Sequence, residues 1–152
     1  MNTLPASSFD TSSVKPTLQH IIDKLIAPLV PIATRNNSLI VNDVPSFLKF
    51  SNDEQIVTSV IDGVLRSVIH NSRETCIRVS AQLLYGKTMV VSVKDSNSFN
   101  TYAVACSLQD VLPLAQKLGG GLDITNQRQK VTTIAFRFPA EPETTQPLKA
   151  VE

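Results

Sequence analysis

The sequence contains no tryptophan, and aromatic residues make up only 5% of its 152 positions. Because 42% of the residues are hydrophobic, the core must be built mainly from aliphatic side chains. A chain of this length buries roughly two thirds of the surface that it exposes when unfolded. It is therefore long enough to form one stable domain without a disulfide or a metal ion.

A strong charge of one sign is also lacking, because the formal net charge is only +1. This balance excludes the basic surface that nucleic acids and anionic membranes require, so we expect no nucleic-acid partner. No apolar run is long enough for a membrane span, and the N-terminus lacks the pattern of a signal peptide. The two cysteines, Cys76 and Cys106, do not have the spacing of metal ligands. We expect both to be reduced thiols in a cytoplasmic protein.

Both ends of the chain are rich in small polar residues or proline and poor in apolar patterning. Such segments cannot bury enough apolar surface to offset the entropy of ordering them. We predict disordered tails over residues 1–14 and 140–152, and one folded domain over residues 15–139.

Periodicity within residues 15–139 predicts helices and strands in a definite order. A helix over 16–33 should end or bend at Pro28 and Pro31. A capping box from Ser51 to Glu54 should open a second helix that stops near residue 71. The other predicted elements are strands over 38–42, 75–84 and 87–95, a helical stretch that ends at residue 118, and a hairpin of 121–126 with 130–138. This order predicts an α/β two-layer sandwich of the α+β type, with a mixed or antiparallel sheet covered by helices on one face.

Two polar residues, Asn71 and Asp95, stand at positions where the apolar patterns of the second helix and of the strand over 87–95 face inward. At about 100° per residue, Asn71 falls within the apolar stripe of the second helix, Ser67 lies at its edge and His70 points away. Asp95 has the parity of the inward-facing residues of its strand. Each polar residue alone would suit the end of its element, Asn71 as a helix cap and Asp95 as the start of a turn. Together they indicate a site at one end of the gap between helix and sheet.

These positions resemble the ATP-binding domain of histidine kinases, which belongs to the GHKL superfamily and has the Bergerat fold. Residues 65–72, Leu-Arg-Ser-Val-Ile-His-Asn-Ser, resemble the N box, and residues 91–99 resemble the strand and turn of the G1 box. The resemblance implies that Asn71 coordinates the Mg²⁺ bound to ATP and that Asp95 accepts a hydrogen bond from the adenine amino group. It implies supporting contacts from Ser67, Asn97 and Ser107. Thr133 falls where the family often has a threonine near adenine, although its parity is opposite to that of Ile134.

The glycines of the nucleotide signature have been replaced. Asn97 and Phe99 stand where the G1 box has glycines. The second glycine box should open the third helix near Ala105–Leu108, but no glycine is present there. The ATP lid is reduced to about ten residues. Helix-start glycines let a backbone approach phosphate closely, so the resemblance is to a degenerate member of the family.

The resemblance implies two functions, and the residues leave both open. One is a domain that binds ATP and Mg²⁺ through a weakened site and acts in signal transduction in a two-component system. The other is a degenerate adaptor or phosphotransfer module that binds a signalling protein without nucleotide. The expected partner is a response regulator or a kinase dimerisation domain. No phosphoacceptor hairpin precedes the first helix, so we expect that the chain does not phosphorylate itself with ATP.

Overall fold

The protein is described by a computed structural model that covers residues 16–98 and 100–142. The tail predicted over 1–14, most of the tail predicted over 140–152, and Phe99 lie outside the described residues. Ala140 was predicted to belong to the second tail, yet it is buried and its backbone bonds to Lys87 and Ser51. The packed part of the chain therefore extends past Pro139.

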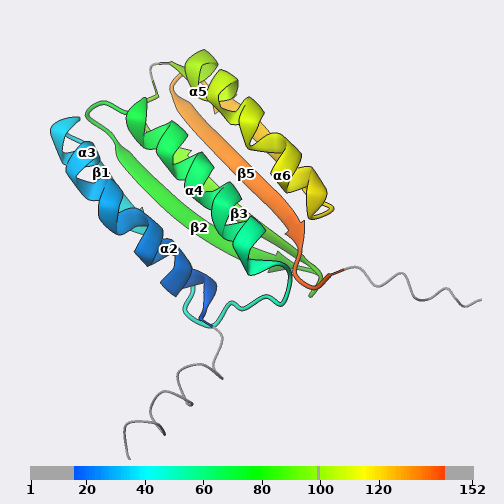
Figure 1. The fold of residues 1–152 in the computed structure, drawn as a ribbon. Helices are drawn as coiled ribbons and strands as arrows, with labels where there is room; N and C mark the ends of the chain where they lie inside the picture. The colour runs from blue at the N-terminus through cyan, green and yellow to red at the C-terminus, as the bar shows by residue number, and fades with distance from the viewer. Residues whose placement is uncertain (1–15, 99, 143–152) are drawn as a thin grey trace, which may run out of the picture.

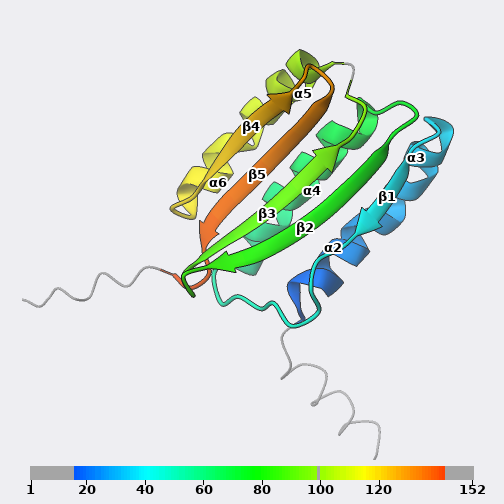
Figure 2. The same cartoon turned by 180° about the vertical axis from the view of Figure 1, so that it is seen from behind.

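Helices cover one face of a five-stranded sheet, and Figures 1 and 2 show this sheet from its two sides. The strands lie in the order β1-β2-β3-β5-β4. Strands β1 and β2 pair in parallel, and every other pair is antiparallel. The predicted two-layer sandwich with a mixed sheet is confirmed. The strands are β1 (Leu39–Asn42), β2 (Cys76–Leu84), β3 (Thr88–Asp95), β4 (Gly121–Gln127) and β5 (Val131–Pro139).

Prolines divide the two outer helical segments. The first predicted helix bends at Pro28 and Pro31 as expected, because a 3₁₀ turn η1 (Ala27–Leu29) separates α2 (Leu18–Ile26) from α3 (Val30–Arg35). The third helical segment is divided in the same way into α5 (Thr101–Ser107), η2 (Leu108–Asp110) and α6 (Leu112–Lys117). Pro113 lies in the first turn of α6, where its missing N–H costs no helical hydrogen bond.

The central helix α4 (Glu54–His70) begins at a different cap from the one predicted. The side chain of Asp53 accepts a hydrogen bond from the Ile56 N–H at 3.1 Å. Glu54 is therefore the first helical residue, so the predicted capping box from Ser51 to Glu54 is wrong. In a capping box, the Glu at the third helical position bonds back to the backbone N–H of the N-cap residue. Glu54 is at the first helical position, so it cannot make this bond.

One stripe of α4 is fully buried against the sheet, as its apolar period predicted. These side chains meet the inward-facing residues of the central strands and form one aliphatic core. The principal contributors are Val57, Val60, Ile61, Val64, Leu65, Val68 and Ile69 from α4, and Ile77, Val79, Met89, Val91, Val93, Ile134 and Phe136 from the sheet.

Candidate functional site

The core becomes polar at one end of the gap between α4 and the sheet. This is the end where α4 and β3 finish and where β5 begins, and it lies beside α5 in Figure 1. Every buried polar or charged residue in the described part of the chain belongs to this end: Ser38, Ser67, Ser72, Thr75, Asp95, Ser98 and Thr132. Since buried polar groups are costly without partners, the hydrogen bonds at this end decide what it can bind.

Asp95 is the most informative of these residues, because it carries a carboxylate and is only 3% exposed. It continues the inward alternation of Met89, Val91 and Val93, so the predicted direction of its side chain is confirmed. Its Oδ1 accepts hydrogen bonds from the Thr75 hydroxyl at 2.6 Å and from the Asn97 N–H at 3.0 Å. Asp95 therefore forms the turn after β3, as one alternative expected, while also being buried in the layer gap.

Thr132 lies directly opposite Asp95 in the pairing of β3 with β5 and is only 2% exposed. Its hydroxyl oxygen lies 2.8 Å from the Thr101 hydroxyl and accepts a hydrogen bond from Asn126 at 2.9 Å. Thr133, the position indicated by the family resemblance, pairs with Lys94 and does not lie beside Asp95. Sequence reasoning missed Thr132, although its parity with Ile134 was a signal that could have found it.

Asn71 is the C-terminal cap of α4 and is partly buried. Its Nδ2 donates to the Ser67 carbonyl oxygen at 2.8 Å, so the amide caps its own helix. This bond leaves the amide oxygen Oδ1 as the atom that could serve as a metal ligand. Asn71 and Asp95 thus terminate neighbouring elements at the same end of the molecule.

Ser67 and Ser107 join α4 to α5. Their hydroxyl oxygens are in hydrogen-bond contact. The carbonyl oxygen of Val104 accepts from both hydroxyls, at 3.3 Å from Ser67 and 2.8 Å from Ser107. The predicted supporting residue Ser107 therefore lies in the last turn of α5, packed against α4.

The third helix begins earlier than the resemblance indicated. The family correspondence implied a helix start near Ala105, whereas the polar residues over 96–101 predicted a loop that leads directly into a helical stretch; α5 begins at Thr101. The side chain of Asn100 caps it by accepting from the Ala103 N–H at 3.1 Å. The expected start near Ala105 is wrong because this cap initiates the helix upstream.

Asn97 ties the same connection to the loop that follows α4. Its backbone N–H donates to Asp95, and its Nδ2 lies 3.3 Å from the Glu74 carbonyl oxygen.

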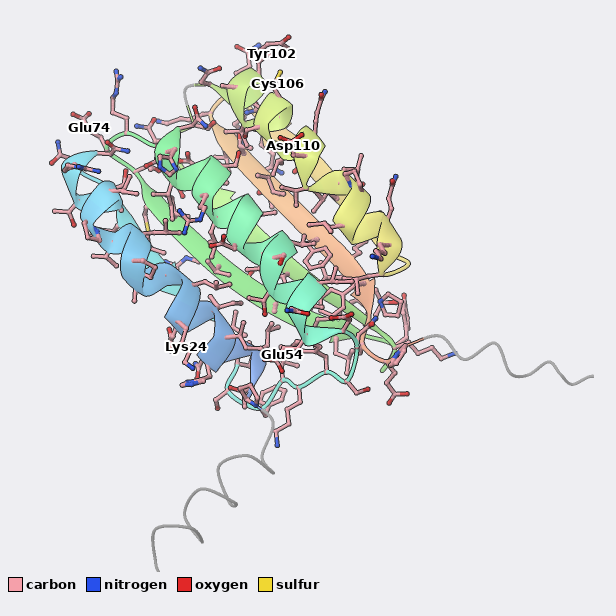
Figure 3. All side chains as sticks on the ribbon, viewed as in Figure 1. Lys24, Glu54, Glu74, Tyr102, Cys106 and Asp110 are labelled. Carbon is pink, nitrogen blue, oxygen red and sulfur yellow. The ribbon has the colours of Figure 1, made fainter. Side chains whose placement is uncertain are left out.

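On the exposed side of α5, a hydrogen bond with Cys106 and the charge on its thiolate raise the pKa of Tyr102. Figure 3 shows these two side chains, Tyr102 and Cys106, together at the outer end of α5.

No protein-family model matches this sequence, and no curated protein matches it. Solved structures do match in fold. The catalytic domain of histidine kinase ThkA aligns with a TM-score of 0.67 at 14% identity, over 84% of this chain and 96% of that domain. Histidine kinase AdeS of Acinetobacter baumannii aligns with a TM-score of 0.63 at 12% identity, over 86% of this chain and 72% of that chain.

Two further matches were solved with ligands or partners. Full-length ShkA in complex with AMPPNP aligns with a TM-score of 0.66 at 16% identity, over 84% of this chain and 31% of that chain. ThkA in complex with the response regulator protein TrrA aligns with a TM-score of 0.65 at 16% identity, over 82% of this chain and 40% of that chain. In the described part of this chain, no helix is long and apolar enough to cross a membrane.

Proposed function

We propose that this chain, whose fold is that of histidine kinase catalytic domains, is a signalling module that binds ATP with Mg²⁺ through a weakened site. The observation that supports it best is the buried carboxylate of Asp95 at the polar end of the layer gap, with Thr132 opposite. A carboxylate in such a place is a strong acceptor for the amino group of a purine. The ShkA structure with AMPPNP adds support, because that protein shares the fold.

The residues fit the adenine end of a nucleotide better than its phosphate end. Asp95 would accept from the adenine amino group, and the Thr132 hydroxyl would contact the ring. The amide oxygen of Asn71 would ligate Mg²⁺, which neutralises phosphate charge when it is bound. These roles rest on a buried carboxylate and on an amide oxygen at one end of the same gap.

The phosphate end offers few donors. The connection over 96–100 contains no glycine, and the first turn of α5 already bonds to Asn100. Phosphate groups would therefore remain largely in water, where their charge contacts are screened. We expect the affinity for ATP to be low.

A titration with Mg²⁺ and a fluorescent ATP analogue tests the proposal. Asp95→Asn removes the charge of the acceptor and should weaken binding by about tenfold, the loss of one charge-assisted hydrogen bond. Asp123→Asn makes the same change on β4, where Asp123 is exposed and bonded to Arg137, and should leave the affinity unchanged. Equal effects of the two variants, or none, would show that adenine is not read by Asp95.

The second candidate is an adaptor or phosphotransfer module that binds a signalling protein without nucleotide. The absence of glycine from the connection over 96–100 favours it, because this connection offers the phosphate groups of a nucleotide no close backbone approach. The partner would be a response regulator or a kinase dimerisation domain, and ThkA, which shares the fold, was solved with a response regulator. Absence of nucleotide binding at millimolar ATP, together with complex formation with such a partner, would favour this second function.

A further inference from the structure

Strand β2 is longer than its neighbour β1, so part of its outer edge has no partner strand. The pairing of β1 with β2 ends at Asn42 opposite Val79, while β2 continues to Leu84. Figure 2 shows β1 beside only one part of the longer strand. After Asn42 the chain leaves the sheet and runs to α4 through residues 43–53. In the described part of the chain, no strand covers the edge of β2 beyond Val79.

The backbone of this edge carries hydrogen-bonding groups without partners. The carbonyl oxygens of Thr75 and Val79 accept from N–H groups of β1 and of the residue after it, at 2.9 and 2.8 Å, so odd-numbered positions face the outer edge. The Leu84 carbonyl instead accepts from the turn before β3. By this alternation the N–H and C=O groups of Ala81 and Leu83 also face outward, and no described residue bonds to them there. Such an edge is where an extended peptide can add to a sheet.

A surface groove of about 480 Å³ lies against this edge. Its lining comes from residues 81–83 of β2 and from residues 45 and 47–49 of the connection between β1 and α4. In this connection Leu48 is buried in the core, whereas Phe47 is 76% exposed. We call this feature the edge groove. It combines an unpaired strand edge with an exposed aromatic side chain.

Side chains of an added strand would enter the edge groove. Ala81 and Leu83 have the same parity as Val79, which is buried against the helical layer. Side chains of adjacent strands alternate in step, so every second residue of an added strand would lie between β2 and Phe47. The groove therefore matches a segment with apolar residues at alternate positions.

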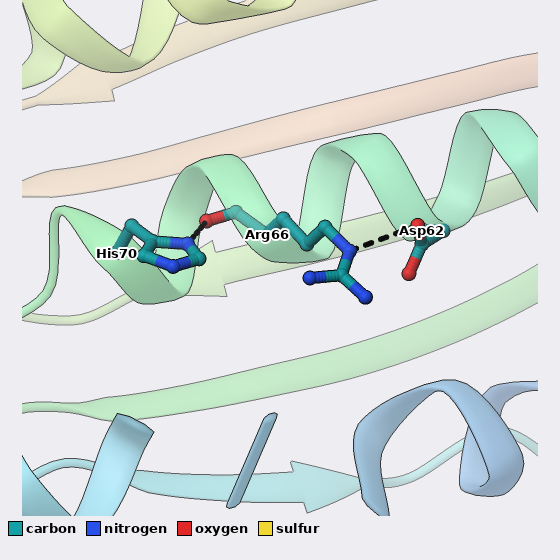
Figure 4. Close-up of polar contacts among 3 residues, drawn as sticks. All are labelled: Asp62, Arg66 and His70. Atoms are coloured by element: carbon teal, nitrogen blue, oxygen red, sulfur yellow. Dashed lines mark hydrogen bonds and ion pairs between the residues drawn. The ribbon is translucent and has the colours of Figure 1, made fainter. Parts of the chain in front are cut away.

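Lys49 is the only charged residue that lines the edge groove. It is exposed, and it makes no ion pair with any described residue. The exposed face of α4 differs in this respect. There the Arg66 Nε lies 3.0 Å from the Asp62 carboxylate, and the Arg66 carbonyl oxygen lies 2.8 Å from the His70 ring (Figure 4). A ligand with a carboxylate would give Lys49 the partner that the described chain does not supply.

We propose that the edge groove binds an extended segment of a partner protein by strand addition. Ala81 and Leu83 bond to the backbone of this segment, Phe47 packs on its apolar side chains, and Lys49 pairs with a carboxylate at one end. The segment thus has apolar residues at alternate positions and an acidic residue of the same parity.

A second copy of this chain matches the edge groove less well. A two-fold contact presents the same residues from both sides, and no carboxylate lines the groove in either copy. Both lysines would then lack a partner. The proposal is also independent of nucleotide binding, because Asp95 pairs with Ile77 near the opposite end of β2.

The heptapeptide Glu-Thr-Val-Thr-Val-Thr-Glu, with a neutral fluorophore and an amidated C-terminus, serves as the probe for the full chain. Its valines and glutamates share one face of a strand, and its symmetry brings a carboxylate to Lys49 in either strand direction. Fluorescence anisotropy should show saturable binding. Lys49→Gln, or glutamine in place of both peptide glutamates, should weaken it about threefold, and the two together no further. Lys117→Gln, an exposed lysine on α6, should leave the affinity unchanged.

Hydrogen exchange in ¹H–¹⁵N spectra tests the backbone contact. The amides of Ala81 and Leu83 should exchange rapidly in the free chain and at least about tenfold more slowly with saturating peptide, whereas the Gln82 amide, which faces β3, should change little. N-methylation of the valine amides and of the threonine amides of the peptide should abolish binding in one case only, because alternate amides face one edge of a strand.

Phe47→Ser should weaken binding about tenfold through the loss of apolar contact. Tyr102→Ser removes an aromatic ring of comparable exposure, 80%, on α5 and should have no effect. The proposal would be overturned by a lack of saturable binding at millimolar peptide, by equal effects of these two variants, or by unchanged exchange at Ala81 and Leu83. Slow exchange at both amides in the free chain would also overturn it, because residues 1–15 or a second copy would then already cover the edge.

Discussion

Asp95 stands where the alternation of β3 calls for an apolar side chain. Burying a carboxylate without partners costs several kcal/mol, so the donors that surround it also stabilise the fold. Thr75 is the closest of them, at 2.6 Å, and is itself only 8% exposed. The acceptor proposed for adenine is thus held in place by groups that belong to the core.

Replacing Thr75 with valine tests how much the fold depends on this bond. Thr75→Val keeps the shape but leaves a buried carboxylate with one donor fewer, so we expect a loss of about 1–3 kcal/mol in the free energy of unfolding. Thr133→Val makes the same change on the opposite face of the sheet and should alter stability by less than about 0.5 kcal/mol. Urea unfolding of the two variants measures both values, and equal losses would contradict a specific role for the Thr75 bond.

At the residue scale, the helix and strand periods predicted the direction of side chains better than the correspondence with family motifs did. Strand alternation alone placed Asp95 inward, and the helix period placed His70 outward. The correspondence with the kinase family pointed to Thr133, whereas the buried neighbour of Asp95 is Thr132. A single shift in register reverses the face of every strand residue, so a motif without an alignment fixes such positions poorly.

At the element scale, the start of α4 depends on Asp53 rather than on Ser51. Asp53→Ala removes the bond to the Ile56 N–H and should lower stability by about 1 kcal/mol, the usual value of an N-cap. Ser51→Ala should change it by less than about 0.5 kcal/mol, because its side chain does not cap the helix. Thermal unfolding of both variants decides the point, and a larger loss in Ser51→Ala would restore the capping box.

The long elements followed from the sequence, and so did the short strand β1, which was predicted over 38–42 and spans Leu39–Asn42, whereas the residues that cap α4 and α5 did not. The buried stripe of α4 and the alternating strands of the β2–β3 hairpin carry strong periods, so their existence followed from the sequence. The start of α5 depends on one local bond from Asn100, and no period precedes it. A helix of seven residues is too short for its own pattern to fix where it begins.

At the scale of the whole molecule, the core of the sandwich is polar at one end and continuously apolar elsewhere. The helices and strands that end there come from distant parts of the chain, so only their packing brings Asn71, Asp95 and Thr132 to one end. The sequence alone indicated a polar site at this end, but it could not show how the elements pack to form it. Because several elements end there, a ligand bound at this end should affect all of them.

A spectrum that resolves each backbone amide during titration with Mg²⁺ and ATP tests the central claim most directly. If the polar end is the nucleotide site, ¹H–¹⁵N shifts should move in fast exchange at Asn71, Asp95 and Thr132, with saturation only at high micromolar ATP or above. The weak affinity follows from the lack of phosphate donors near α5. Unchanged amides at this end at millimolar ATP, or shifts confined to the opposite end around Gly119 and Gly120, would contradict the account.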